Sequence, residues 1–281
     1  MNVEYDTVPL EFYDHLKDAE TDRQLEEIRF LIIACWVLQW GYIAADVGGY
    51  LCDALSGRHY YDWFRRWEQK KYFASAKPSN CTRRIYSLRE EGFHRLLMLT
   101  NLKTDEDFRL LRVDRISPRT VEHNLLCQRV VRFMLGTGYD EYAGIAGATG
   151  QSQLRIKEPD AIVRKLDPYH TRGVEMECSP KGTWAFLEGV HASARSIKMG
   201  MVDSVAYFTA VKAIYDRLVD VRENGLASRL PWDNENIWEP ENGRLKLRPE
   251  IRKQFSVYYV PDLSTSLRGQ DERQKDRYKR G

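Results

Sequence analysis

The sequence has no apolar run long enough to span a bilayer and no cysteine pair of the kind that holds zinc. Its longest unbroken apolar run covers residues 30–38, far fewer than the ~20 residues of a membrane-spanning helix. The five cysteines are widely spaced and include no CxxC pair, so we expect reduced thiols rather than a disulfide framework. The acidic N-terminus lacks the basic and then apolar leader of a secreted protein. We therefore expect a cytoplasmic protein without membrane insertion.

Two common ligand-binding loops are also missing. The glycine-rich stretch at 144–150 lacks the Gly-Lys-Ser/Thr ending of a phosphate loop, so we interpret it as a connector. The acidic residues between 233 and 241 match no calcium loop. With 281 residues, of which 43% are apolar and 30% charged, the composition is typical of one or two globular domains.

Net charge is only +2, but the charges are segregated along the chain. Residues 1–57 hold three Lys/Arg against eleven Asp/Glu, whereas residues 58–89 hold nine against two. A basic segment inside a nearly neutral protein favours a nucleic-acid interface, although a solvated helix surface also explains such a segment. The basic tail after residue 267 has no apolar anchor, and we expect it to be disordered and to add nonspecific affinity for phosphates.

Hydrophobic periodicity predicts helices over 22–38, 43–53 and 57–70, two strand-like runs at 71–75 and 83–88, and a helix over 89–100. This order is the layout of a winged helix-turn-helix. In the third helix, Tyr60, Trp63, Phe64 and Trp67 share one sector and should pack in the core, while the basic residues gather on the opposite side.

The basic side of the third helix and the following hairpin supply the candidate DNA-binding residues. The first residues of such a helix lie nearest to base edges in a major groove, and basic residues of the hairpin reach phosphates. The candidates are Arg58, His59, Tyr60, Arg65, Arg66, Lys77, Arg83 and Arg84.

A second region begins with a helix that Ser117 can cap and Pro118 can open. In this helix His123 shares a sector with Cys127 and Val130, so it should face inward. Two interpretations stay open at this point. His123 is either a core histidine satisfied by a hydrogen bond, or a ligand or proton carrier at a site.

Three acidic residues are predicted to meet in this second region. In GVEMECS, strand alternation directs Glu175 and Glu177 to one face, and the preceding strand opens with Pro159-Asp160. Three carboxylates sharing a small space need protons or a cation to offset their repulsion, and oxygen ligands suit Mg²⁺ or Mn²⁺. A solvent-exposed strand face would also account for the two glutamates.

Several of these sequence segments resemble motifs of known families. IAADVGGYL, GRHYYDWFRRWEQKKYF and RRIYSLREEGFHRLL resemble the winged-helix region of the replication-relaxation family, with Lys71 where the family has glycine. Pro159-Asp160 and Glu175-Met176-Glu177 are similar to the motifs of the PD-(D/E)XK nuclease core, with Glu177 at the usual lysine position. The combination, over residues 21–221, also resembles the neighbouring MOBC-class plasmid mobilisation relaxases.

The resemblance implies an α+β fold: an N-terminal winged helix-turn-helix followed by a restriction-endonuclease-like (PD-(D/E)XK) α/β domain. The implied organisation is an N-terminal extension (1–20), the winged helix (21–102), a linker (103–116), the nuclease-like domain (117–265) and a basic tail (266–281).

The resemblance also implies a function, namely site-specific, metal-dependent nicking of DNA at a plasmid transfer origin. Asp160 and Glu175 would hold Mg²⁺ or Mn²⁺, and Glu177 would be a further ligand or orient a water. Lys181, four residues on, would stabilise charge developing on the phosphate, and His123 would be a ligand or proton carrier. The implied partners are double-stranded DNA with an origin-like site and other mobilisation or conjugation proteins.

Alternatives remain open at the level of sequence. The nucleophile would be water or a tyrosine, with Tyr139, Tyr142 and Tyr169 in the relevant half. Because the usual lysine is missing, a noncatalytic DNA-binding accessory protein of replication or mobilisation, with a degenerate nuclease fold, is the main alternative function. A transcriptional repressor with a ligand-sensing second domain is another.

Overall fold

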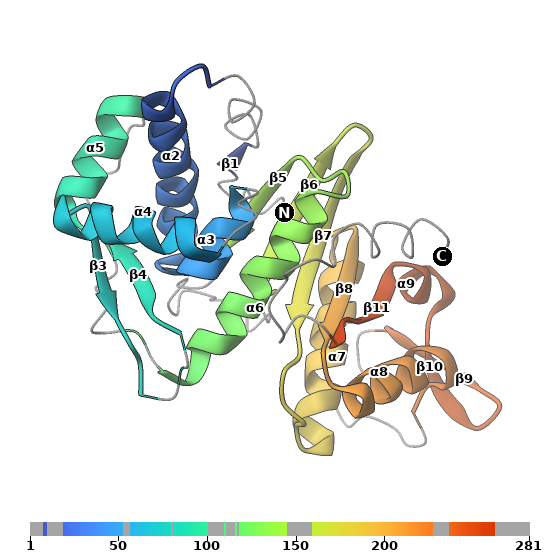
Figure 1. Ribbon diagram of the computed structural model, residues 1–281. Coiled ribbons are helices and arrows are strands. Elements are labelled where there is room, and N and C mark those ends of the chain that lie inside the picture. Colours follow the sequence, from blue (N-terminus) through green and yellow to red (C-terminus); the bar gives the residue numbers. More distant parts are fainter. Residues whose placement is uncertain are drawn as a thin grey trace.

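The computed structural model of the chain has an α+β fold (Figure 1). It describes residues 8–9, 19–52, 57–79, 81, 83–100, 110, 116, 118–144, 159–226 and 236–261. Across these ranges, every helix is too short or too polar to cross a lipid bilayer. The cysteines are free thiols, as expected from their spacing.

The first group of elements surrounds a small antiparallel sheet with the strand order β2-β4-β3. Its members are α2 (Asp22–Trp40), β2 (Ile43–Ala44), α3 (Ala45–Leu51), α4 (Gly57–Gln69), β3 (Phe73–Ala76), β4 (Ile85–Leu88) and α5 (Glu90–Thr100). The four predicted helices and two predicted strands are confirmed. The one difference is at Ile43 and Ala44, which were assigned to a helix but pair with β4 as strand β2.

Helix α2 begins and ends with local signals. Thr21 accepts a hydrogen bond from the backbone of Gln24, and the Gln24 side chain accepts one from the backbone of Thr21, which together form a capping box. At the other end, Gly41 adopts a left-handed conformation (φ 77°) and closes the last turn. These caps fix where the tryptophan-bearing end of α2 lies.

The second group is built on a six-stranded sheet with the order β1-β5-β6-β7-β8-β11. Neighbours from β1 to β7 are antiparallel, and β7, β8 and β11 are parallel. The elements are β1 (Val8–Pro9), α6 (Pro118–Leu135), β5 (Glu141–Gly144), β6 (Ala161–Leu166), β7 (Tyr169–Met176), α7 (Thr183–Lys198), β8 (Ser204–Thr209), α8 (Lys212–Asn224), β9 (Trp238–Glu241), β10 (Arg244–Leu247), α9 (Pro249–Lys253) and β11 (Phe255–Tyr259).

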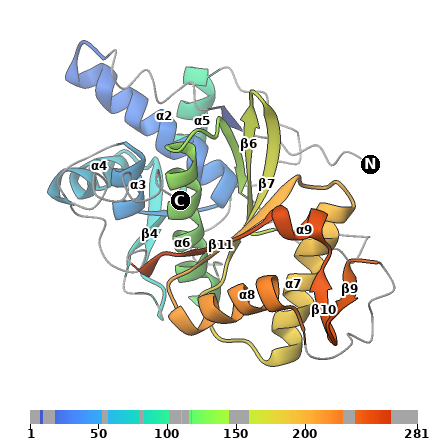
Figure 2. The same cartoon turned by 90° about the vertical axis from the view of Figure 1, so that its right-hand side faces the viewer.

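Helices cover both faces of this sheet (Figure 2). Alternate residues of the central strands divide between two apolar clusters, as the period of two requires. Val174 and Met176 pack on the side of α6, whereas Ile162 and Val205 pack on the side of α7 and α8. The arrangement is a sheet between two helical layers.

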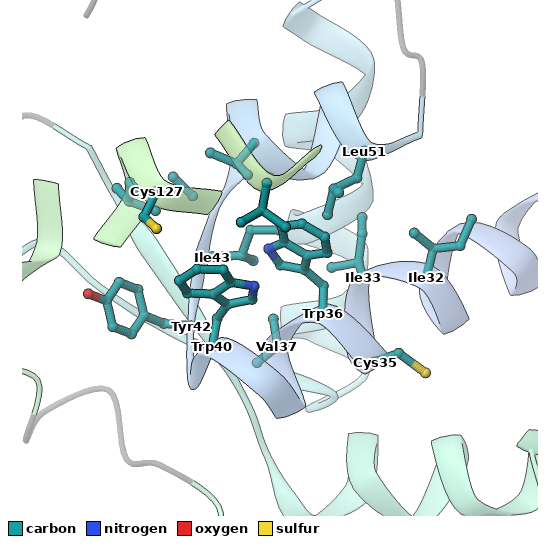
Figure 3. Packing of buried hydrophobic residues seen from close by; sticks show 14 of the residues in the cluster. Ile32, Ile33, Cys35, Trp36, Val37, Trp40, Tyr42, Ile43, Leu51 and Cys127 are labelled. Carbon is teal, nitrogen blue, oxygen red and sulfur yellow. The ribbon is translucent and has the colours of Figure 1, made fainter. Parts of the chain in front are cut away.

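One apolar cluster joins the two groups of elements, with α6 between them (Figure 1). The Trp36 indole donates a hydrogen bond of 2.9 Å to Gln128 Oε1, and Gln128 Nε2 donates one of 2.9 Å to the Tyr42 carbonyl. Figure 3 shows Trp36 and Trp40 packed together, with Cys127 of α6 nearby. The buried core is therefore continuous from α2 to the large sheet. The domain boundaries stay predictions.

Candidate functional site

Helix α4 has an apolar side and a cationic side, as the sequence predicted. Trp63, Phe64 and Trp67 are at most 5% exposed, whereas the side chains of Arg65 and Arg66 are 74% and 44% exposed. Burial of the aromatic side in the core fixes the rotation of the helix. The two arginines are consequently held at the surface.

The aromatic residues at the start of α4 divide between core and solvent. Tyr60 is half-buried, and a Cβ placed on Gly49 would lie 2.2 Å from the Tyr60 ring. Tyr60 therefore packs on α3, and the outward residue is Tyr61, which is 53% exposed. Its position four residues before Arg65 is a signal that the sequence analysis missed. The side chains of Arg58 and His59 lie outside the described residues.

Acidic residues lie beside the cationic side of α4. Glu26 of α2 lies 3.6 Å from the Arg66 guanidinium and 3.2 Å from Lys70 Nζ, and Asp62 lies 3.7 Å from Arg65. Such exposed pairs contribute little to stability. They leave the cationic side chains able to exchange a carboxylate for a phosphate.

The end of α4 is closed by a lysine in a conformation that favours glycine. Lys71 has φ 60°. The Lys71 N–H donates to the Glu68 carbonyl at 2.9 Å, and the Tyr72 N–H donates to the Trp67 carbonyl at 2.8 Å, which is the Schellman pattern. The position where the resembled family has glycine is therefore one where the backbone favours glycine.

The two arginines of the β3–β4 hairpin have different surroundings. Arg84 is exposed and donates a hydrogen bond of 2.8 Å to Ser75 Oγ, which in turn donates to Glu68 of α4. Lys77 is also exposed. These contacts place Arg84 beside α4, where a cation can contribute to one continuous surface.

Arg83 instead lies in a network of charges between the hairpin, α3 and α6. Its guanidinium lies 2.8 Å from Glu122 Oε2 and 3.3 Å from Asp46 Oδ2. Cys81 donates to the other oxygen of Glu122 at 3.0 Å, and Arg129 also pairs with Asp46. The structure thus gives Arg83 a role in attaching the hairpin to α6, unlike the outward role that the sequence predicted.

A second set of polar side chains gathers at the edge of the large sheet where β7 and β8 end. Asp160 lies just before β6, which is antiparallel to β7, and Glu177 directly follows β7. Lys181 precedes α7. The carboxyl ends of parallel strands are a common location for ligand sites in α/β sheets. We call this set, with Glu175, the acidic edge.

Asp160 is paired with His123. The Asp160 Oδ2 atom accepts a hydrogen bond of 2.7 Å from the Met176 backbone and lies 3.3 Å from His123 Nε2. His123 Nε2 also lies 2.8 Å from the Met176 carbonyl oxygen. The hydrogen bond to Asp160 raises the pKa of His123 to about 9, although burial opposes the shift.

Glu175 is buried and faces the other side of the sheet. It is 4% exposed, and Ser193 of α7 donates a hydrogen bond of 3.3 Å to its Oε1 atom. The Ser193 hydroxyl also lies 2.8 Å from that of Tyr207. Asp160 therefore bonds to α6 on one face and Glu175 to α7 on the opposite face. Ser193 and Tyr207 are site residues that the sequence analysis missed.

Glu177 is paired with Lys181. The Lys181 ammonium donates a hydrogen bond of 2.6 Å to Glu177 Oε2, and the Lys181 carbonyl accepts one of 3.1 Å from Arg217. Lys181 therefore lies at this edge, while its implied role on a phosphate stays a prediction. The Lys181 ammonium thus neutralises the Glu177 carboxylate through a charge-assisted hydrogen bond, which is stronger than a hydrogen bond between neutral groups.

The residues of the acidic edge do not fit the expected metal site. Among the described residues, no group of three or more His, Cys, Asp or Glu side chains is placed to hold a metal ion. Asp160 and Glu177 each have a cationic partner, and Glu175 accepts from a hydroxyl group. The carboxylates are thus satisfied separately and do not converge on one point.

The chain matches no family model, no curated protein and no solved structure in the three comparisons made. The assignments to the replication-relaxation family and to the PD-(D/E)XK nucleases therefore stay predictions based on short motifs.

Proposed function

We propose that this protein binds duplex DNA through α4 and the β3–β4 hairpin. The observation that carries the proposal is the cationic side of α4, held outward by a buried aromatic side and extended by Arg84 of the hairpin. The element order from α2 to β4, with the strand order β2-β4-β3, supports the winged-helix arrangement expected for such binding.

The proposed contacts follow from exposure. Arg65 and Arg66 project from α4 and would contact the phosphates that line a groove, while Lys77 and Arg84 would contact the phosphates on one flank. Phosphate contacts supply affinity without sequence preference, and base contacts supply specificity. We infer that Tyr61, which is also exposed on α4, contacts bases and so contributes to specificity.

The experiment measures binding of a fluorescein-labelled duplex pool of random sequence at several salt concentrations. Replacing Arg65 and Arg66 together by alanine should reduce the affinity at least ~10-fold at low salt, and should lower the slope of log K against log salt by about two, because two phosphate contacts are lost. Lys253→Ala, at an exposed position on α9, is the matched control. Equal binding by both variants would contradict the proposal.

Phosphodiester cleavage at the acidic edge is a second candidate function. It is supported by the order α6-β5-β6-β7-α7-β8, which is consistent with the order expected of a nuclease core, and by Asp160, Glu177 and Lys181 lying around one strand edge. Against it, the carboxylates among the described residues do not converge on one metal site. A tyrosine nucleophile is disfavoured for the three tyrosines named from sequence. Tyr139 and Tyr142 are buried, and Tyr169 begins β7 at the end opposite to Glu177.

Supercoiled plasmid incubated with the protein and Mg²⁺ or Mn²⁺ separates the two candidates. Relaxation that is lost in Asp160→Ala and Glu175→Ala would establish cleavage. Binding without relaxation would support the noncatalytic function, in which the protein acts as a DNA-binding accessory factor of replication or mobilisation. Reactions containing a metal chelator serve as the control for nuclease contamination.

A further inference from the structure

The end of α4 carries two cations that share one carboxylate. Arg66 and Lys70 are four residues apart, and the Lys70 N–H donates a hydrogen bond of 3.0 Å to the Arg66 carbonyl, so both side chains lie on one side of the helical turn. The Arg66 guanidinium lies 3.6 Å from Glu26 Oε2, and Lys70 Nζ lies 3.2 Å from Glu26 Oε1. Each oxygen of the Glu26 carboxylate therefore meets a different cation at the end of α4.

Building on the proposed DNA binding, we propose that Lys70 is a further phosphate contact and that Glu26 is a positioning residue, which holds Lys70 and Arg66 where a phosphate of bound DNA takes its place. A phosphodiester group, like a carboxylate, offers negatively charged oxygens to cations. The exchange brings Glu26 close to the incoming phosphate, and this like-charge repulsion weakens binding. Glu26 holds the two exposed side chains only weakly, so their prearrangement offsets little of the repulsion. The net effect of Glu26 is to lower the affinity for DNA.

The surroundings of Glu26 allow this exchange. The side chains of Lys70 and Arg66 are 52% and 44% exposed, and that of Glu26 is 31% exposed. Glu26 also lines a cavity of about 620 Å³ between α2, α5 and the end of α4, with Tyr72 and Arg95 among the other lining residues. The carboxylate can therefore turn away from α4 into open space when a phosphate arrives.

The neighbouring Glu27 supplies a matched comparison. It lies 2.8 Å from Arg95 of α5 and 3.7 Å from Arg23, and neither arginine belongs to the proposed DNA-binding surface. Its side chain is 35% exposed, which is close to the value for Glu26. Glu26→Gln and Glu27→Gln thus remove the same charge from adjacent positions of α2, but the first alone releases Arg66 and Lys70.

The test measures binding of the same labelled duplex pool at several salt concentrations. Glu26→Gln should bind about 3- to 10-fold more tightly than wild type at low salt, because binding no longer breaks two exposed ion pairs, whereas Glu27→Gln should bind as wild type. Lys70→Ala should bind more weakly and lower the slope of log K against log salt by about one, because one phosphate contact is lost. Equal affinities of Glu26→Gln and wild type, equal gains in the two glutamine variants, or an unchanged slope in Lys70→Ala would overturn the proposal.

A double-mutant cycle tests whether Glu26 acts through these two cations. In a background carrying Arg66→Ala and Lys70→Ala, Glu26→Gln should give no gain in affinity. A gain of the same size there would attribute the effect of Glu26 to net charge and overturn the positioning role. Absence of duplex binding in wild type and in Glu26→Gln alike would contradict both proposals, whereas binding by both with one affinity would overturn this inference alone.

Discussion

Lys71 shows how a single residue can be held in a conformation that its side chain disfavours. Its φ of 60° is available to glycine without steric cost. We predict that Lys71→Gly raises the free energy of unfolding by about 0.5–1 kcal/mol, because relief of the left-handed strain exceeds the added chain entropy. Urea unfolding measures the change. Lys71→Ala removes the same charge and should give no gain, and equal stability of the two variants would contradict the explanation.

His123 predicts a dependence of stability on pH. Its pKa is about 9 in the folded protein, against an ordinary value of 6.5. A raised pKa stabilises the fold fully below about pH 6.5, and this contribution is lost as the pH rises through about 9. We expect a loss of about 1–2 kcal/mol across this range, discounted for partial exposure. Urea unfolding of wild type and of His123→Gln across the range should give curves that converge at high pH, and parallel curves would argue against the shift.

At the scale of elements, the β3–β4 hairpin carries two adjacent arginines with separable effects. Arg83→Ala removes the cation that pairs with Glu122, while Asp46 keeps its pair with Arg129, so we predict a loss of about 1–3 kcal/mol in the free energy of unfolding. Arg84→Ala should leave stability nearly unchanged and lower the salt slope of DNA binding by about one. Denaturation and anisotropy on both variants test the pair. Identical effects would show that the two positions are not distinct.

The sequence predicted the elements with a clear periodic pattern and the β3–β4 hairpin, and it missed several other short strands. The aromatic spacing of α4 and the alternation of β7 were sufficient to predict these two elements, because one side of each is buried and burial produces the periodic pattern. Strands β2 and β5 were missed since two to four residues carry little pattern, and their pairing depends on distant strands. For the site, alternation placed Glu175 correctly on the face opposite Met176. Alternation could not place Asp160, because this residue precedes strand β6 and its side chain turns toward His123 of α6.

At the scale of the whole molecule, α6 contacts both groups of elements. Its neighbouring residues Glu122 and His123 bond respectively to Arg83 of the hairpin and to Asp160 at the strand edge. The proposed DNA-binding surface and the acidic edge are therefore attached to the same helical turn. Boundaries inferred from composition did not reveal this link, because it is made by side chains distant in the sequence.

The tryptophan-bearing end of α2 packs against α6, so a shortened chain without α6 should be poorly packed. A fragment of residues 19–100 would lose Gln128, the acceptor of the Trp36 indole, together with the apolar surface of α6 that covers its neighbours. We predict that this fragment binds the dye ANS and melts without a sharp transition, as loosely packed states do, whereas a fragment extended to residue 144 would be better packed. A sharp melt of the shorter piece would refute this. The two groups of elements should accordingly be expressed and engineered as a single piece.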